Sequence, residues 1–115
     1  MSTLKRFSTL LAALVLTMGM HNAMADNPAS YDSSCKKPEY PRASLVNEEA
    51  GTVSLSFLVA PDGKVVDSKI EKSSGFKNLD KAAQKDMSAC KFKPAVKDGK
   101  PVESWTKVDW VWKLD

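Results

Sequence analysis

The chain has 115 residues, with 17 lysines and arginines, 14 aspartates and glutamates, one histidine and two cysteines. A positively charged start, the apolar run Leu10–Met18 and an Ala-x-Ala site ending at Ala25 are the three parts of a cleaved secretory signal. The apolar run is too short to span a bilayer. We therefore expect residues 1–25 to be removed. We expect the remaining 90 of the 115 residues to have no membrane anchor, and this cut lowers the net charge from +3 to +1.

The mature chain lacks the residues that most enzymes and metal sites require. His21 is the only histidine and is lost with the signal, so no imidazole remains as a general base or a zinc ligand. A net charge near zero, with scattered lysines, gives no electrostatic footprint for nucleic acid. We therefore predict no catalytic residue, no metal, no cofactor and no nucleic-acid partner.

Two cysteines, Cys35 and Cys90, remain in the mature chain. An exported protein enters an oxidising compartment, where a disulfide is the default. The rival interpretations are weaker, because the chain has no Cys-x-x-Cys redox motif, and two thiolates without histidine make a poor zinc site. The disulfide would stabilise the fold by about 4 kcal/mol in the chain-entropy treatment. It would hold a polar arm, residues 26–37, against a domain formed by residues 38–115.

The first predicted elements of the domain are a short helix and a strand. Pro41 suits the first turn of a helix, which we expect over Arg42–Ala50, with Gly51 as its C-terminal cap. Apolar residues then alternate with threonine and serine from Thr52 to Val59. This period of two, with one apolar face, is typical of a half-buried strand.

A hairpin follows this strand. Residues 60–63 (Ala-Pro-Asp-Gly) form a turn signal, in which proline presets the backbone and Gly63 adopts the left-handed conformation. The chain is expected to return as a second strand over Val65–Lys72, with Val66 and Ile70 facing inward. The three residues Ser73-Ser74-Gly75 end that strand.

Beyond this break the apolar period becomes helical. Asn78 is a plausible cap, and Asp80 lies in the first turn, where the helix dipole favours a carboxylate. One stripe along the helix consists of Leu79, Ala83, Met87 and Cys90. We expect this stripe to face the core and the lysines between its members to face solvent.

The last predicted strand is Trp105–Leu114. Alternation gives it one face with Val108, Trp110, Trp112 and Leu114, and another with Trp105, Lys107, Asp109, Val111 and Lys113. The order helix, strand, strand, helix, strand predicts an α+β fold, in which a three-stranded antiparallel sheet has two helices packed on one face. Such a sheet has two free edges.

Several short motifs together resemble the C-terminal domain of the TonB energy-transducer family over nearly the whole mature chain. They are Tyr40-Pro41, Asp62-Gly63, Ser73-Ser74-Gly75, Leu79-Asp80, Phe92-x-Pro94 and Gly99-x-Pro101. The resemblance implies a periplasmic module that binds the TonB box, a peptide segment of outer-membrane transporters, as a strand added to its last strand. The binding residues it implies here are Glu39, Trp105, Lys107, Asp109, Val111 and Lys113.

The chain also departs from the family pattern. TonB proteins that transduce energy have an uncleaved membrane helix and a long proline-rich spacer, whereas we expect a cleaved signal and only residues 26–37 before the domain. We therefore do not expect this chain to transduce energy. The alternative is a stand-alone envelope interaction protein, an inhibitor or chaperone-like, that keeps the fold without binding a TonB box. A homodimer is left open, and an edge covered by Cys35–Lys37 or by a second copy would favour the alternative.

Overall fold

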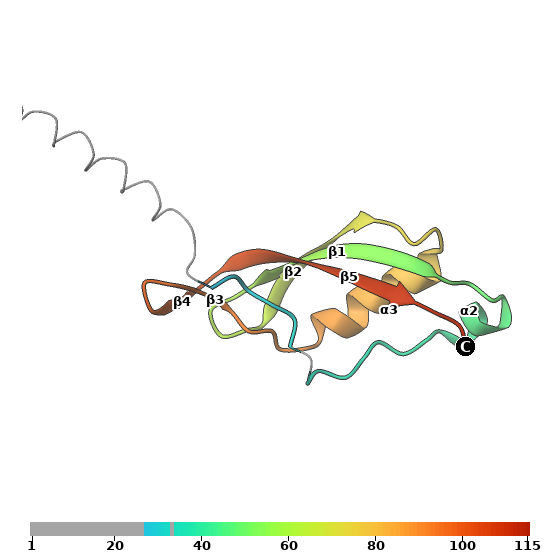
Figure 1. Ribbon diagram of the computed structural model, residues 1–115, viewed down its shortest axis with the longest axis horizontal. Coiled ribbons are helices and arrows are strands. Elements are labelled where there is room, and N and C mark those ends of the chain that lie inside the picture. Colours follow the sequence, from blue (N-terminus) through green and yellow to red (C-terminus); the bar gives the residue numbers. More distant parts are fainter. Residues whose placement is uncertain (1–26, 33) are drawn as a thin grey trace, which may run out of the picture.

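The computed structural model describes residues 27–32 and 34–115 (Figure 1). The expected signal peptide, residues 1–25, lies outside these ranges. The elements are α2 (Arg42–Val46), β1 (Gly51–Val59), β2 (Val65–Lys72), α3 (Lys77–Ser88), β3 (Ala95–Lys97), β4 (Lys100–Val102) and β5 (Ser104–Trp112). In the described ranges, no helix has the length and hydropathy needed to cross a membrane.

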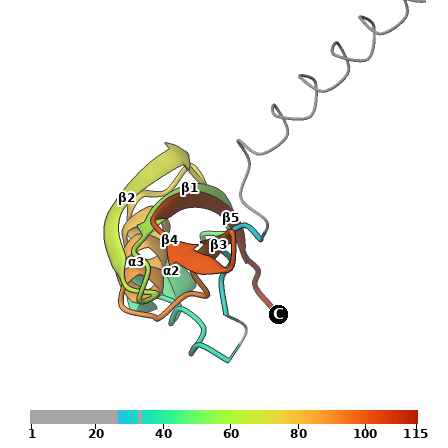
Figure 2. The same ribbon diagram turned by 90° about the vertical axis from the view of Figure 1, so that its left-hand side faces the viewer.

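The main sheet has three antiparallel strands in the order β2–β1–β5. β1 therefore lies in the middle, paired with β2 through the hairpin and with β5 along its whole length. α3 lies under β1 and β2, and Figure 2 shows the sheet curving over this helix. The predicted α+β fold is confirmed, and β2 and β5 are its two edges.

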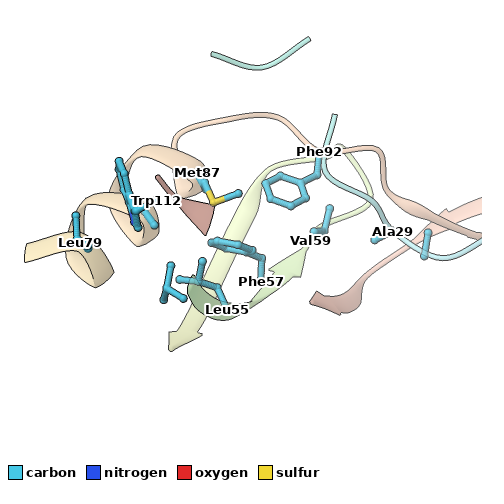
Figure 3. Close-up of a cluster of buried hydrophobic side chains, with 11 residues drawn as sticks. Ala29, Leu55, Phe57, Val59, Leu79, Met87, Phe92 and Trp112 are labelled. Carbon is cyan, nitrogen blue, oxygen red and sulfur yellow. The ribbon is translucent and has the colours of Figure 1, made fainter. Parts of the chain in front are cut away.

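The core lies between β1 and α3. The strand contributes Val53, Leu55, Phe57 and Val59, and the helix contributes Leu79, Ala83 and Met87, all fully buried (Figure 3). Phe92, which follows the helix, packs its ring 5.2 Å from that of Phe57. Both apolar stripes predicted from the sequence are thus confirmed.

The hairpin between β1 and β2 forms as predicted, but one inward residue was assigned wrongly. Gly63 has a φ of +91°, and a register shift follows Leu58, so the hairpin carries a bulge. This shift places Val65 opposite Val59 and leaves Val66 55% exposed. A bulge breaks the period of two, so Val66 does not face the core as expected.

Ile70 of β2 lies only partly inward. It is opposite the fully buried Leu55, on the face expected for it, yet it remains 38% exposed. No described strand covers β2 on its outer side. A residue on an edge strand therefore keeps contact with solvent even on the core-facing side.

The short helix α2 is shorter than expected and ends at Val46, not at Ala50. The N–H of Glu49 donates to the Ser44 carbonyl at 2.8 Å, and the Ser44 hydroxyl donates to the Glu49 carboxylate at 2.7 Å. These two bonds fold residues 47–49 into a turn. Gly51 is therefore not a helix cap, and it opens β1, where a Cβ would lie 2.7 Å from the Ser74 carbonyl oxygen.

α3 begins at Lys77 with Phe76 as its N-cap, so the expected cap at Asn78 was wrong. The side chain that organises this end is Asp80, which is buried. Its carboxylate accepts hydrogen bonds from the Ser74 N–H at 2.8 Å, from the Ser74 hydroxyl at 2.7 Å and from the Ser73 hydroxyl. Burial by itself would raise the pKa of Asp80, but these bonds outweigh it and lower the pKa below its ordinary value.

A two-stranded hairpin, β3 and β4, was not predicted from the sequence. Its turn is Asp98-Gly99, with φ values of +52° and +77°, typical of a two-residue hairpin turn. The N-terminal arm packs on this part of the chain. The N–H of Asn27 donates to the Val96 carbonyl, and the N–H of Ser30 donates to the Lys93 carbonyl. Each strand has three residues, too few to show a period in the sequence.

The predicted disulfide between Cys35 and Cys90 is present, with 6.0 Å between the two Cα atoms. It joins the arm to the segment just after α3. Tyr31 adds an edge-to-face contact with Phe92, with ring centroids 5.3 Å apart. The arm is therefore part of the packed domain from Asn27 onward.

Candidate functional site

β5 is paired on one side only. All nine of its residues oppose β1 in an unbroken register, from Ser104 opposite Val59 to Trp112 opposite Gly51. Within residues 27–32 and 34–115, no other strand pairs with β5, and no backbone hydrogen bond joins Cys35–Lys37 to it. The backbone groups that point away from β1 are therefore available to an incoming strand.

The structure brings five of the six predicted site residues together. Trp105, Lys107, Asp109 and Val111 are exposed on the outer face of β5, and Lys113 is exposed just beyond its end. Val111 has the largest exposed fraction given for an apolar side chain of this strand, 57%, followed by Trp105 with 42%. The alternation read from the sequence therefore assigned the two faces of β5 correctly, although the strand ends at Trp112 and not at Leu114.

Glu39 lies apart from this face. Its N–H donates to the Asp86 carboxylate of α3 at 3.0 Å, which places it on the helix side of the sheet. The next residue, Tyr40, packs against Trp112 with ring centroids 4.9 Å apart. Glu39 is therefore near the end of β5 but does not share its outer face.

The outer face also carries residues of β1 and β2 that sequence reasoning did not select. The Ser56 hydroxyl donates to the Glu71 carboxylate at 2.6 Å, and the ammonium of Lys69 lies 4.4 Å from the ring centroid of Trp105. The bond from Ser56, partly opposed by burial, lowers the pKa of Glu71, and the cations Lys69 and Lys107 add to this effect. These side chains line a shallow pocket of about 290 Å³. Alternation predicts their outward direction, but only the register brings them beside Trp105.

The inner side of β5 is only partly covered. α3 lies under β1 and β2, so the ends of β5 are covered by other segments: Thr106 donates its hydroxyl to the Ala29 carbonyl at 2.9 Å, and Trp112 packs on Tyr40. Between these ends, Val108 and Trp110 are half-buried. An added strand could therefore bury more apolar surface under this edge.

The other free edge, β2, is protected. Its pairing with β1 has two register shifts, one near each end, which leave Val66 and Glu71 without a direct partner. Bulges are a usual device that prevents pairing with another strand, whereas the register of β5 has none. Of the two edges, β5 is therefore the more regular one for pairing with a further strand.

The described residues show no arrangement for metal binding. Residues 27–32 and 34–115 contain no group of three or more histidine, cysteine, aspartate or glutamate side chains that could hold a metal ion. A hollow of about 840 Å³ between α2 and α3 is lined by Tyr40, Leu45, Arg42, Lys81 and Lys85, among others. Its lining also includes Glu39 and Asp86, so it combines apolar, cationic and acidic side chains.

Comparisons with known proteins agree with this fold. Residues 36–114 match the family model described as Gram-negative bacterial TonB protein C-terminal. Protein TonB of Neisseria meningitidis serogroup C is 52% identical over 59 residues, which cover 51% of this chain and 21% of that protein. Protein tonB2 of Pseudomonas aeruginosa is 35% identical over 78 residues, which cover 68% of this chain and 29% of that protein.

A solved structure leads to the same assignment. The solution NMR structure of the Pseudomonas aeruginosa TonB CTD superposes with a TM-score of 0.60 at 25% sequence identity, covering 70% of this chain and 81% of that one. The matched region spans less than a third of the length of the two curated relatives. From the family match and the shared fold we conclude that this chain belongs to the family of Gram-negative bacterial TonB protein C-terminal domains.

Proposed function

We propose that this protein is a periplasmic binding module that takes up a peptide segment of an envelope protein as an additional strand along β5. The segment expected from the family is the TonB box of an outer-membrane transporter. The observation that supports this proposal most directly is the free edge of β5, regular over nine residues, while β2 is bulged.

The energetics favour weak and reversible binding. Each backbone hydrogen bond contributes about 0.5–1.5 kcal/mol net, whereas ordering the peptide backbone costs about 1–2 kcal/mol per residue. Backbone pairing by itself therefore roughly balances the ordering cost. The surplus must come from side chains, including the half-buried Val108 and Trp110 on the inner side and exposed residues such as Trp105 on the outer side.

A second candidate is a stand-alone envelope interaction protein, an inhibitor or chaperone-like, that keeps this fold without binding a TonB box. A second copy of the chain on the edge of β5 would have the same consequence, because it would compete with the peptide. The absence of backbone bonds between Cys35–Lys37 and β5, among the residues described, supports peptide binding. Sedimentation over a range of protein concentrations would detect the homodimer.

The test is an amide NMR titration of the oxidised protein, without residues 1–25, with TonB-box peptides from the transporters of its own host. We expect chemical-shift changes concentrated in residues 105–113 and small changes in β2. Unchanged spectra at millimolar peptide would refute the proposal and favour the second candidate.

Two proline variants compare the edges. The N–H of Ala60 donates to the Lys64 carbonyl, so by alternation the N–H of Ser56 faces β2. Lys107 and Lys69 both lie opposite Ser56, so the N–H of Lys107 points to the free edge and that of Lys69 points back toward β1. On β2, the neighbouring Ser68 has the outward N–H, and proline is tolerated at such edge positions. Lys107→Pro should greatly weaken the peptide-induced shifts, whereas Ser68→Pro should leave most of them. Equal losses in two folded variants would count against β5 as the binding edge.

A further inference from the structure

We infer that β5 selects its peptide by charge, favouring a strand that carries an acidic side chain beside Lys107 and a basic side chain beside Asp109. The two charges would be two residues apart on one face of the peptide. This inference rests on the proposed strand addition at β5 and adds the chemistry of the partner.

The register of the sheet defines the two positions. On the outer face, side chains form rows across the strands: Lys69 of β2, Ser56 of β1 and Lys107 of β5 make one row. The next row ends in Asp109, which lies opposite Ser54. An added strand would extend each row by one residue, so its side chains would lie directly beside Lys107 and Asp109.

Among the described residues, both charged side chains lack a close partner. Neither the Lys107 ammonium nor the Asp109 carboxylate makes a hydrogen bond or a close ion pair with another described residue. The charge of Lys107 does contribute to lowering the pKa of Glu71. The Glu71 carboxylate, however, accepts its hydrogen bond from Ser56 and also interacts with the charge of Lys69. The side of Lys107 that faces the free edge therefore remains available to an acidic group, and Asp109 to a basic one.

The inner side of β5 defines the other face of the peptide. Val108 and Trp110 are half-buried, and α3 packs mainly against β1 and β2. Apolar side chains on the peptide would contact them and complete their burial. The partner is therefore an amphipathic extended segment, apolar on one face, with opposite charges two residues apart on the other.

Four peptides of one nine-residue scaffold test the inference. They differ only at two outer-face positions, two residues apart, which carry Glu and Lys, Lys and Glu, two Glu, or two Lys. For the wild-type protein we expect one mixed-charge peptide to bind about tenfold more tightly than either like-charge peptide, by amide NMR at low salt. Tenfold corresponds to about 1.4 kcal/mol. Which mixed-charge peptide binds more tightly also reports the direction of the added strand.

Charge variants should change the order of affinities. Asp109→Lys should come to prefer the peptide with two Glu, and Lys107→Glu the peptide with two Lys. Lys72→Glu makes the same charge change on the protected strand β2, in the row of Asp109, and should leave the order unchanged. Both site residues are exposed, so the variants should fold, and their amide spectra would show whether they do.

Three outcomes would overturn the inference in distinguishable ways. If all four peptides shift the amides of β5 with equal affinity, charge selection is refuted, while strand addition stands. If none of them and no TonB-box peptide causes shifts at millimolar concentration, the proposed function fails together with the inference. A preference that persists undiminished in 1 M salt would also contradict it, because exposed charge pairs are screened at that ionic strength.

Discussion

Breaking the disulfide between Cys35 and Cys90 should lower the free energy of unfolding by about 4 kcal/mol. The bond joins residues separated by 55 positions, and the chain-entropy treatment assigns about 4 kcal/mol to a loop of this length at 25 °C. The loop contains α2, β1, β2 and α3, so most of the unfolded domain gains freedom when the bond is removed.

The folded state should lose little when the bond is broken. The arm would still be held by backbone bonds from Asn27 and Ser30 and by the contact between Tyr31 and Phe92. We therefore expect a folded but less stable protein. For a domain of this size, 1 kcal/mol changes the melting temperature by about 4–8 °C. The expected decrease is therefore roughly 15–30 °C.

Urea unfolding and thermal melts of three samples would measure the effect: the oxidised protein, the same protein with reductant, and the variant Cys35→Ser/Cys90→Ser. The reduced protein and the double variant should behave alike. A loss of less than about 1 kcal/mol in both would refute the loop-closure reasoning. The double variant should still bind the peptide, because neither cysteine contributes to the edge of β5.

Two further predictions concern the loops that hold the sheet. Gly63→Ala should cost about 2 kcal/mol or more, because Gly63 has a φ of +91° and a Cβ there would lie 2.5 Å from the Phe92 carbonyl oxygen; an unchanged urea midpoint would contradict this. Asp80→Asn should cost about 1.5–3 kcal/mol at neutral pH, the range for hydrogen bonds to a charged group. The bonds from Ser73 and Ser74 lower the pKa of Asp80 below 3.8 despite burial. Its contribution is therefore fully present above that value and is lost as the pH falls through the folded-state pKa. The urea midpoints of the wild-type protein and Asp80→Asn, measured at several pH values, should converge in acid. A difference between the two midpoints that stays constant with pH would refute the role given to the Asp80 carboxylate.

Local patterns predicted several elements because each is determined by neighbouring residues. The hairpin at Gly63 follows from turn chemistry, and the two faces of β5 follow from alternation, which the structure confirms. The core-facing stripe of α3 follows from helical spacing. The disulfide followed from the expected compartment and from the presence of two cysteines in the mature chain.

The errors occurred where side-chain contacts outside the local pattern decide the conformation. We expected Asn78 to cap α3, but the helix begins at Lys77, and the Asp80 carboxylate orders the preceding turn through bonds from Ser73 and Ser74. The contact of Gly51 with Ser74 belongs to two segments far apart in the sequence. Propensity describes what a segment prefers by itself, and such contacts override it.

The sequence by itself determined that this protein has an exposed strand face with Trp105, Lys107, Asp109 and Val111, because a period of two requires no knowledge of neighbours. Only the tertiary structure decided that β5 pairs with β1, not with β2, so that the second edge of the sheet is the bulged strand β2. The alternating pattern of β5 suits a place beside either strand. The choice depends on which strands α3 covers and on the bulges that leave β2 unsuited to a second partner.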